Sequence, residues 1–182
     1  MILNIGGSGG VGKTTLADFL ELIFPDTFVR LVTYTNRKMR SGEIRARSYH
    51  FKESEFREED GFVLRRVRGE CFYAVRRSDL DIAEKIVVTT FPPSGVLKLE
   101  QLGYVVCPTY LELSEHERIQ RMKNRGDQLD SIRDRILSDK TESTLAITQT
   151  ALRSRPLVVL DARKPIEILA IEVKQITESI IF

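Results

Sequence analysis

The sequence predicts an α/β fold in which a central parallel sheet lies between two layers of helices, as a three-layer sandwich. Three observations support this prediction. Short apolar runs of buried-strand type alternate along the chain with segments whose apolar residues recur at helical spacing. A glycine-rich turn connects the first such strand to the first such helix. The chain has 182 residues, which is long enough for one α/β domain with a substantial core.

The first predicted unit is a strand, a glycine-rich loop and a helix. A strand at 2–5 precedes Gly7–Thr14, which fits the P-loop pattern G-x-x-x-x-G-K-[ST] without a mismatch. The following helix ends near Pro25, because proline stops a helix. A glycine-rich turn that matches by chance is the alternative, but it would not need a strand before it and a helix after it. The pattern therefore predicts the P-loop NTPase fold.

The residue types of this loop match the chemistry of triphosphate binding. Glycines let the backbone curl so that successive N–H groups face phosphate oxygens, and the helix N-terminus adds partial positive charge. Lys13 would reach the β- and γ-phosphates, and the Thr14 hydroxyl would bind Mg²⁺. We therefore predict ATP and Mg²⁺ as cofactors. The predicted cofactor-binding residues are Gly7, Ser8, Gly9, Gly10, Val11, Gly12, Lys13, Thr14 and Thr15.

A polar, arginine-rich segment then interrupts the alternation. Phe28–Thr33 is predicted as the second strand, and an inserted substrate-binding subdomain follows it. Inside the insertion, 62–64 and 71–73 have the composition of short strands around a turn. The predicted single domain, 1–182, has a core of 1–33 and 79–182 and an insertion of 34–78.

The second half of the chain returns to alternating strands and helices. Ser114 and Glu117 form a capping box at the start of a helix that runs through Arg125. Asp79 and Asp81 precede the third core strand and are predicted as helix-capping residues. The remaining predicted elements are strands at 86–90, 104–113 and 157–160 and helices at 94–102, 131–151 and 166–181.

Composition excludes several classes of protein. A net charge of +2 provides no basic surface for nucleic acid, and no apolar segment approaches the length of a membrane span. The N-terminus lacks the basic and long apolar regions of a signal peptide. Cys71 and Cys107 lie in apolar surroundings without metal-ligand spacing, and we interpret both as reduced core or near-core residues. We expect a cytoplasmic monomer or homodimer.

Arginines accompany the P-loop in two groups. Arg37 and Arg40 follow the second strand, at the edge of the sheet where the P-loop lies. There they would bind a phosphate bidentately, and the hydroxyls of Tyr49 and Tyr73 would complete the site. A solvated loop is the alternative for such a charged run taken alone.

The second group flanks a glycine-bearing turn. Arg121 and Arg125 are four residues apart and share one helix face, and Arg135 follows the turn. An arginine lid at about 125–131 would stabilise the negative charge that spreads over the oxygens in phosphoryl transfer. A surface helix with solubilising arginines is the alternative, and the intact P-loop favours the lid.

With these residues the sequence resembles the guanylate kinases, which are P-loop nucleoside monophosphate kinases. The resemblance extends from Gly7 to Arg135. Its most specific part is the pattern T-R-x-x-R-x-G-E…Y-x-F, which begins at position 36, where Asn36 stands in place of the usual threonine before the first arginine, and includes Glu43.

The resemblance implies γ-phosphoryl transfer from ATP to a nucleoside monophosphate. The lid and the insertion would close over both substrates and exclude water. The residues implied to act in transfer are Lys13, Arg40, Arg121, Arg125 and Arg135. The residues implied to bind the acceptor monophosphate are Thr33, Arg37, Arg40, Tyr49 and Tyr73.

One departure from the family concerns the acceptor base. Guanylate kinases have a glutamate just after a Phe-Ile pair, and its carboxylate accepts from guanine N–H groups. Here this position falls on Leu64, or on Val63 if the turn is one residue longer, and neither side chain accepts a hydrogen bond. Glu70 is the nearest carboxylate, but it occupies another place in the turn. A site without its hydrogen-bond partner discriminates poorly, so the sequence leaves the acceptor base open.

A second departure concerns the end of the third core strand. The family has an Asp-x-Asp-x-x-Gly signature there, whereas this chain has no acid at either aspartate and matches only at Gly95. Asp161, at the end of the last predicted strand, is a possible substitute, although its place favours a loop near the adenine.

Three hypotheses follow. The first is a phosphotransferase that acts on GMP, dGMP or another monophosphate. The second is a non-catalytic nucleotide-binding or interaction module, as the missing acids suggest. The third, nucleic-acid binding through 37–47, lacks interleaved aromatic residues and a basic overall charge. The complete P-loop favours the first, with small-molecule nucleotides as partners.

Overall fold

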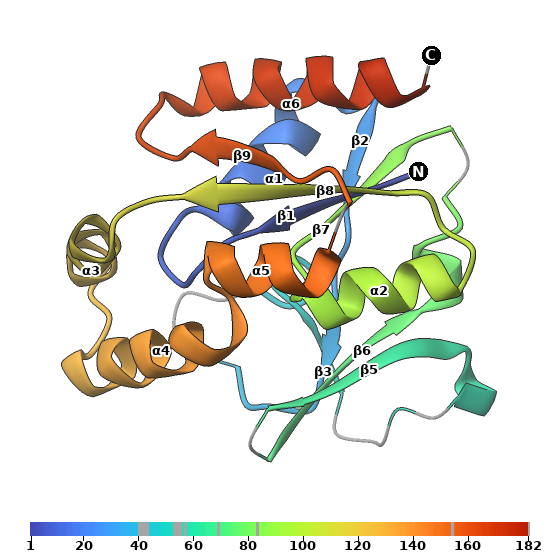
Figure 1. Cartoon of the computed structure of the whole chain (residues 1–182). Helices are drawn as coiled ribbons and strands as arrows, with labels where there is room; N and C mark the ends of the chain where they lie inside the picture. The colour runs from blue at the N-terminus through green and yellow to red at the C-terminus, as the bar shows by residue number, and fades with distance from the viewer. Residues whose placement is uncertain are drawn as a thin grey trace.

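A five-stranded parallel sheet forms the centre of the computed structural model (Figure 1). Its strands lie in the order β2-β7-β1-β8-β9, which places β1 in the middle. The strands are β1 (Ile2–Gly6), β2 (Phe28–Arg30), β7 (Ile86–Thr89), β8 (Val106–Glu112) and β9 (Val158–Asp161). The structure describes residues 1–39, 44–52, 56, 58–68, 70–82, 84–153 and 155–181.

Helices cover both faces of this sheet. On one face α1 (Lys13–Ile23) packs beside α6 (Ile166–Ile181), and on the other α2 (Pro93–Gln101) packs beside α5 (Leu145–Leu152). Buried apolar side chains fill both layers, because each strand and each helix turns an apolar face inward. The predicted three-layer α/β class is therefore confirmed.

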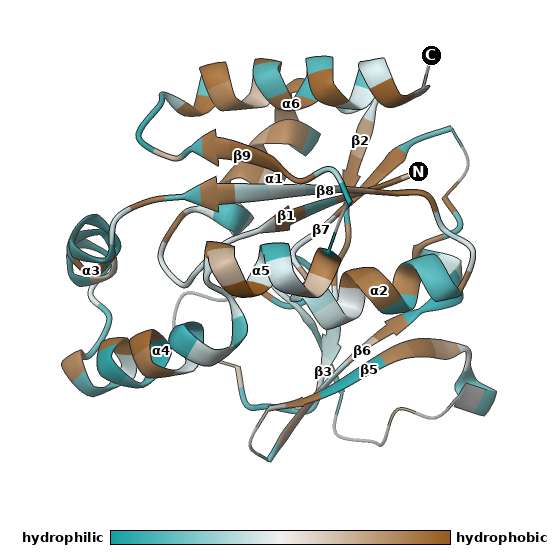
Figure 2. Ribbon diagram, in the orientation of Figure 1, coloured by the Kyte–Doolittle hydropathy of each residue, from teal (hydrophilic) through white to brown (hydrophobic). Residues whose placement is uncertain are grey.

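Two further helices continue beyond the C-terminal end of β8. They are α3 (Glu115–Asn124), which is mostly hydrophilic in Figure 2, and α4 (Leu129–Glu142). The capping box predicted at the start of α3 is present, since Ser114 Oγ accepts from the Glu117 amide at 3.3 Å. The hydrogen bond from Ser114 also lowers the pKa of the Glu117 carboxyl. The predicted lid corresponds to the turn between α3 and α4.

A second sheet of four strands lies below the first in Figure 1, in the order β4-β3-β6-β5. Phe56, Phe62 and Ala74 form its small core, with Tyr34 packed against them. Leu64 and Val75 join this sheet to the central one through a shared apolar cluster. The strands are β3 (Tyr34–Thr35), β4 (His50–Phe51), β5 (Phe62–Arg68) and β6 (Cys71–Arg76), and two 3-10 helices, η1 (Glu58–Asp60) and η2 (Arg77–Asp79), flank β5 and β6.

Two predicted elements differ from the structure. The helix predicted over 131–151 is two helices, because the Thr144 side chain caps the start of α5 by accepting from the Ile147 amide at 3.3 Å. The strand predicted over Phe28–Thr33 ends at Arg30. The chain leaves the central sheet after Leu31, whose amide donates to the Val88 carbonyl, and then forms β3 of the second sheet.

The capping role predicted for Asp79 and Asp81 is wrong. Only the short η2 forms there, and no side chain caps its start. Asp81 instead accepts a hydrogen bond from the Tyr104 hydroxyl at 2.6 Å. Burial, together with this bond, raises the pKa of Tyr104 to about 12.

Both cysteines are free thiols, in agreement with the sequence. Cys107 is buried in the core under α1 and α6, whereas Cys71 is half-buried at the start of β6. Within the described ranges, no helix has both the length and the apolar composition needed to cross a membrane.

Candidate active site

A cleft of about 1070 Å³ opens at the C-terminal edge of the central sheet. The P-loop, the second sheet and helix α4 each contribute residues to its walls. The structure thus brings together segments that are far apart in the sequence, as expected at this edge of a parallel sheet. The predicted residues that line it are Gly7, Gly9, Gly10, Val11, Gly12, Lys13, Thr14, Thr15, Thr33, Arg37, Tyr49, Tyr73, Arg121, Arg125 and Arg135. Ser8 faces away toward a smaller pocket, and Arg40 lies outside the described residues.

The P-loop backbone has the conformation that its glycines predict. Gly10 and Gly12 have φ values of +81° and +109°, a region that residues with a Cβ rarely enter. Gly12 is the N-cap of α1 and makes no side-chain capping bond. The first amides of α1 therefore point toward the cleft without a side-chain acceptor, which is the arrangement that binds phosphate at a helix N-terminus.

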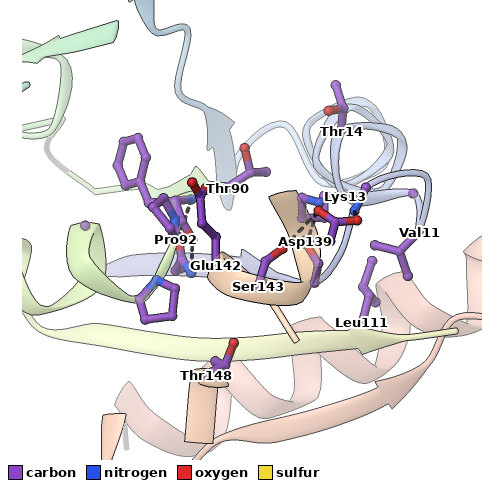
Figure 3. Close-up of a pocket in the computed structure, with 18 of the residues that line it drawn as sticks. Val11, Lys13, Thr14, Thr90, Pro92, Leu111, Asp139, Glu142, Ser143 and Thr148 are labelled. Atoms are coloured by element: carbon purple, nitrogen blue, oxygen red, sulfur yellow. Dashed lines mark hydrogen bonds between the residues drawn. The ribbon is translucent and has the colours of Figure 1, made fainter. Parts of the chain in front are cut away.

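Lys13 and Thr14 lie at the mouth of this loop (Figure 3). The Lys13 ammonium donates to the carbonyl oxygens of Gly7 at 2.6 Å and Ser8 at 3.0 Å, so it lies across the loop. Thr14 is exposed at the start of α1. These two side chains have the chemistry that a phosphate and its Mg²⁺ ion need.

The predicted acceptor residues form one aromatic and cationic group on the second sheet. The Arg37 guanidinium carbon lies 4.7 Å from the centroid of the Tyr49 ring, and the rings of Tyr49 and Tyr73 are 6.0 Å apart. Asn36 faces the end of β6 instead, where its Oδ1 accepts from the Phe72 amide at 2.7 Å. Asn36 therefore fixes the loop that carries Arg37, and Thr33 lines the same cleft.

The three lid arginines separate into two environments. Arg121 lies against the P-loop, where it donates to the carbonyls of Val11 at 2.9 Å and Ala162 at 2.7 Å. Arg125 and Arg135 both contact the Asp127 carboxylate in the turn between α3 and α4. The Asp127 hydrogen bond raises the pKa of Arg125. Only the latter two arginines thus belong to the turn.

The end of β7 contains no carboxylate. Counting back from Gly95, Thr90 and Pro92 occupy the two aspartate positions of the family signature, and both line the cleft (Figure 3). Asn4 of β1 holds this segment: its Oδ1 accepts from Thr89 Oγ1 at 2.9 Å and from the Phe91 amide at 2.8 Å. The sequence analysis did not single out Asn4, although a polar residue within an apolar, buried strand indicates a hydrogen-bonding role.

Asp161 does not replace the missing acids. Its two oxygens accept from the Arg163 guanidinium, and these bonds lower the pKa of Asp161 to about 2. In the part of the chain that the structure describes, no group of three or more His, Cys, Asp or Glu side chains is arranged to hold a metal. Within the P-loop, the Thr14 hydroxyl is the side-chain group whose chemistry fits a Mg²⁺ ligand.

Leu64 packs into the apolar cluster between the two sheets, as its side chain requires. Arg66 follows Leu64 by two residues in β5. It lies in register with Tyr73 of β6 and lines the cleft. Arg66 forms an ion pair with Glu142, at the C-terminal end of α4. This pair connects α4 to the second sheet, and the sequence alone did not indicate it.

A buried polar cluster behind the P-loop was also missed. It contains Gly9, Arg118, Asp139 and Ser143, and we call it the Arg118–Asp139 cluster. The sequence indicated this cluster only weakly. Arg118 lies four residues before the core residue Met122, so helical spacing places this arginine on the inward face of α3.

The fold and the cleft together define a P-loop nucleotide-binding protein. A guanylate kinase from Chlamydia felis is 31% identical over 140 residues, which cover 72% of this chain and 68% of that protein. A guanylate kinase from Chlamydia pneumoniae is 41% identical over 54 residues, but these span only 30% of this chain and 26% of that protein. No protein-family model matches the chain.

The solved structure of guanylate kinase from Anaplasma phagocytophilum has the same fold. It superposes with a TM-score of 0.61 over 98% of this chain and 85% of that one, at 17% identity. The chain belongs to the guanylate kinase family, as a divergent member.

Proposed function

We propose that this protein transfers the γ-phosphoryl group of ATP to a nucleoside monophosphate. One observation carries the proposal: the P-loop lysine, the arginine and tyrosines of the second sheet and the lid arginines all line one cleft. Phosphoryl transfer depends mainly on positioning two substrates and neutralising charge, and these groups supply both.

Each wall of the cleft has a role in this proposal. The α1 N-terminus and Lys13 bind the β- and γ-phosphates, while Arg37, Tyr49 and Tyr73 bind the acceptor phosphate opposite. Arg125 and Arg135 close over the transferred group and exclude water. Thr14 would hold Mg²⁺, which supplies charge neutralisation at the phosphates when bound.

A non-catalytic nucleotide-binding module is the second candidate. Thr90 and Pro92 at the aspartate positions favour it, because the end of β7 offers no charge to a metal or an acceptor. Retention of Lys13 and of the lid arginines favours the kinase, because both act on a γ-phosphate.

The test is to mix the protein with Mg-ATP and one of GMP, dGMP, AMP, CMP, UMP or dTMP, and to follow ADP formation. We expect ADP formation that depends on one class of acceptor. ATP binding without any acceptor-dependent ADP would reject the kinase and support the binding module. A preference for GMP would mean that a residue other than Leu64 recognises guanine.

A further inference from the structure

The Arg118–Asp139 cluster places an ion pair against the backbone of the P-loop. Asp139 Oδ2 accepts from the Gly9 amide at 2.7 Å and from Arg118 Nη1 at 2.8 Å. Arg118 Nη1 also donates to the Gly9 carbonyl at 3.0 Å. The carboxylate and the guanidinium therefore hold the N–H and the C=O of one P-loop residue.

Both charges of this pair are buried. Arg118 is 7% exposed and Asp139 is 8% exposed. The second carboxylate oxygen is also satisfied, because Ser143 Oγ donates to it at 3.0 Å. The carbonyl of Ser143 in turn accepts from Ser8 Oγ at 3.1 Å and from the Tyr110 hydroxyl at 2.9 Å. Strand β8, helices α3 and α4 and the P-loop thus meet in one hydrogen-bonded network.

A buried ion pair is a poor source of stability, because desolvation of two charges offsets their attraction. An apolar pair of similar volume would pack these helices at least as well. What the charged pair adds is a fixed geometry, since its hydrogen bonds hold one orientation of α4 relative to the P-loop.

The same helix carries Arg135, one turn before Asp139. A Cβ atom on Gly9 would lie 2.3 Å from Cδ of Arg135, so the stem of this arginine lies directly on the P-loop. Gly9 therefore contacts α4 at two points, the Asp139 carboxylate and the Arg135 stem. Because Asp139 and Arg135 lie on one helix, a shift of Asp139 would also move Arg135 relative to Gly9.

We propose that Asp139, with Arg118 as its counter-charge, is a positioning residue that fixes lid helix α4 and the Gly9 peptide in the geometry for phosphoryl transfer. The catalytic part of this inference rests on the proposed function. The structural part is that Asp139 restrains the P-loop in the absence of bound nucleotide. This part holds whether or not the protein has kinase activity.

The decisive variant is Arg118→Met with Asp139→Ala, which removes both charges together. A single substitution would leave a buried unpaired charge, whereas the double variant leaves none, so its melting temperature is expected to fall less than that of either single variant. The matched control is Lys140→Met on the same helix, because Lys140 is exposed next to Asp139 in sequence and does not line the cleft.

Three quantities are measured in each variant: hydrogen exchange of the peptide that contains Gly9 without nucleotide, the dissociation constant of ATP, and kcat. For the double variant we expect exchange at least tenfold faster, kcat at least tenfold lower and a dissociation constant within about threefold of wild type. A purely structural pair would leave exchange and kcat at wild-type values in a folded variant, and that result would overturn the proposal.

The exchange measurement separates this inference from the proposed function. If the wild-type protein phosphorylates no acceptor, faster exchange in the double variant still supports the restraint by Asp139, and unchanged exchange still rejects it. If the double variant does not fold, Ser143→Ala removes only the hydroxyl that donates to Asp139. This milder variant is expected to exchange about threefold faster, and wild-type exchange in it would reject the proposal.

Discussion

The proposed phosphate-binding half of the cleft and the proposed acceptor half are built from different kinds of groups. The P-loop side depends on backbone amides, on glycines with positive φ and on Lys13, and it retains the whole family pattern. The acceptor side depends on side chains that project from the second sheet and from the end of β7. There Thr90 and Pro92 stand at the two family aspartate positions, and Leu64, or Val63, stands at the position of the family glutamate.

This difference shows which parts of such a site tolerate substitution. A backbone cradle cannot be changed one contact at a time, because its geometry depends on several glycines together. A side-chain contact disappears with a single substitution, and the fold survives. We therefore expect ATP binding to follow the family more closely than acceptor recognition does.

The largest effect is expected for Lys13→Ala on the P-loop side. Loss of a charged donor at the transferred phosphate should lower kcat by about 10²–10³-fold, while the melting temperature changes little. Steady-state kinetics and thermal unfolding measure the two effects, with Lys123→Ala on exposed α3 as the control. Near-normal activity in Lys13→Ala would refute the role of this lysine.

On the acceptor side, Arg37→Ala and Arg40→Ala should each weaken acceptor binding and leave ATP binding unchanged. Loss of one charged hydrogen bond of about 1.5–3 kcal/mol corresponds to roughly a 10- to 150-fold rise in the acceptor KM. Titrations with acceptor and with ATP separate the two halves of the cleft. If both ligands bind an Arg40→Ala variant normally, the assignment of the phosphate site is wrong.

Thr90→Asp would restore one carboxylate at the end of β7 and make the acceptor side more like the family. The Thr90 side chain is exposed at the cleft, so the substitution should not disturb the core. We expect half-maximal activity at about tenfold lower Mg²⁺, because a carboxylate adds the negative charge that the end of β7 lacks. Exposed Thr141→Asp on α4 serves as the control. An unchanged Mg²⁺ dependence would show that the charge is supplied elsewhere.

Arg66→Ala removes the ion pair that connects the acceptor sheet to α4. Both side chains are partly exposed, at 38% and 44%, so the pair contributes only about 0–1 kcal/mol to stability. We expect an almost unchanged melting temperature. Because Arg66 lines the cleft two residues from Leu64, near the position of the family's base-recognising glutamate, we also expect a severalfold change in acceptor KM that differs between bases. Equal changes for all monophosphates would place Arg66 outside base recognition.

The smallest effect on activity is expected from the cysteines. Burial raises the pKa of the Cys107 thiol to about 11, so this thiol keeps its proton in the folded protein at pH 9, where an unfolded cysteine is mostly ionised. Its contribution to stability is therefore full below about pH 8 and declines as the pH rises further. Alkylation at pH 8 should modify half-buried Cys71 and leave Cys107 intact until the protein unfolds. Equal labelling of both cysteines in the folded protein would contradict this.

Local pattern was enough to predict the α/β class, the P-loop and the capping box at Ser114. The reason is that each depends on residues adjacent in the chain: a glycine-rich turn between a strand and a helix, and a side chain bonded three residues away. The division of the chain into core, insertion and lid, and the roles of the arginines, stay predictions of the sequence.

Contacts between distant segments were decided only by the tertiary structure. Asp139 meets Gly9 across 130 residues of chain, and Arg66 meets Glu142 across 76. Neither pair has a local pattern, because partners on different elements are brought together by packing of those elements and not by spacing along the chain. By itself, the sequence determined the fold class and predicted which groups bind phosphate, whereas the packing of α3, α4 and the second sheet decided which side chains hold those groups in place.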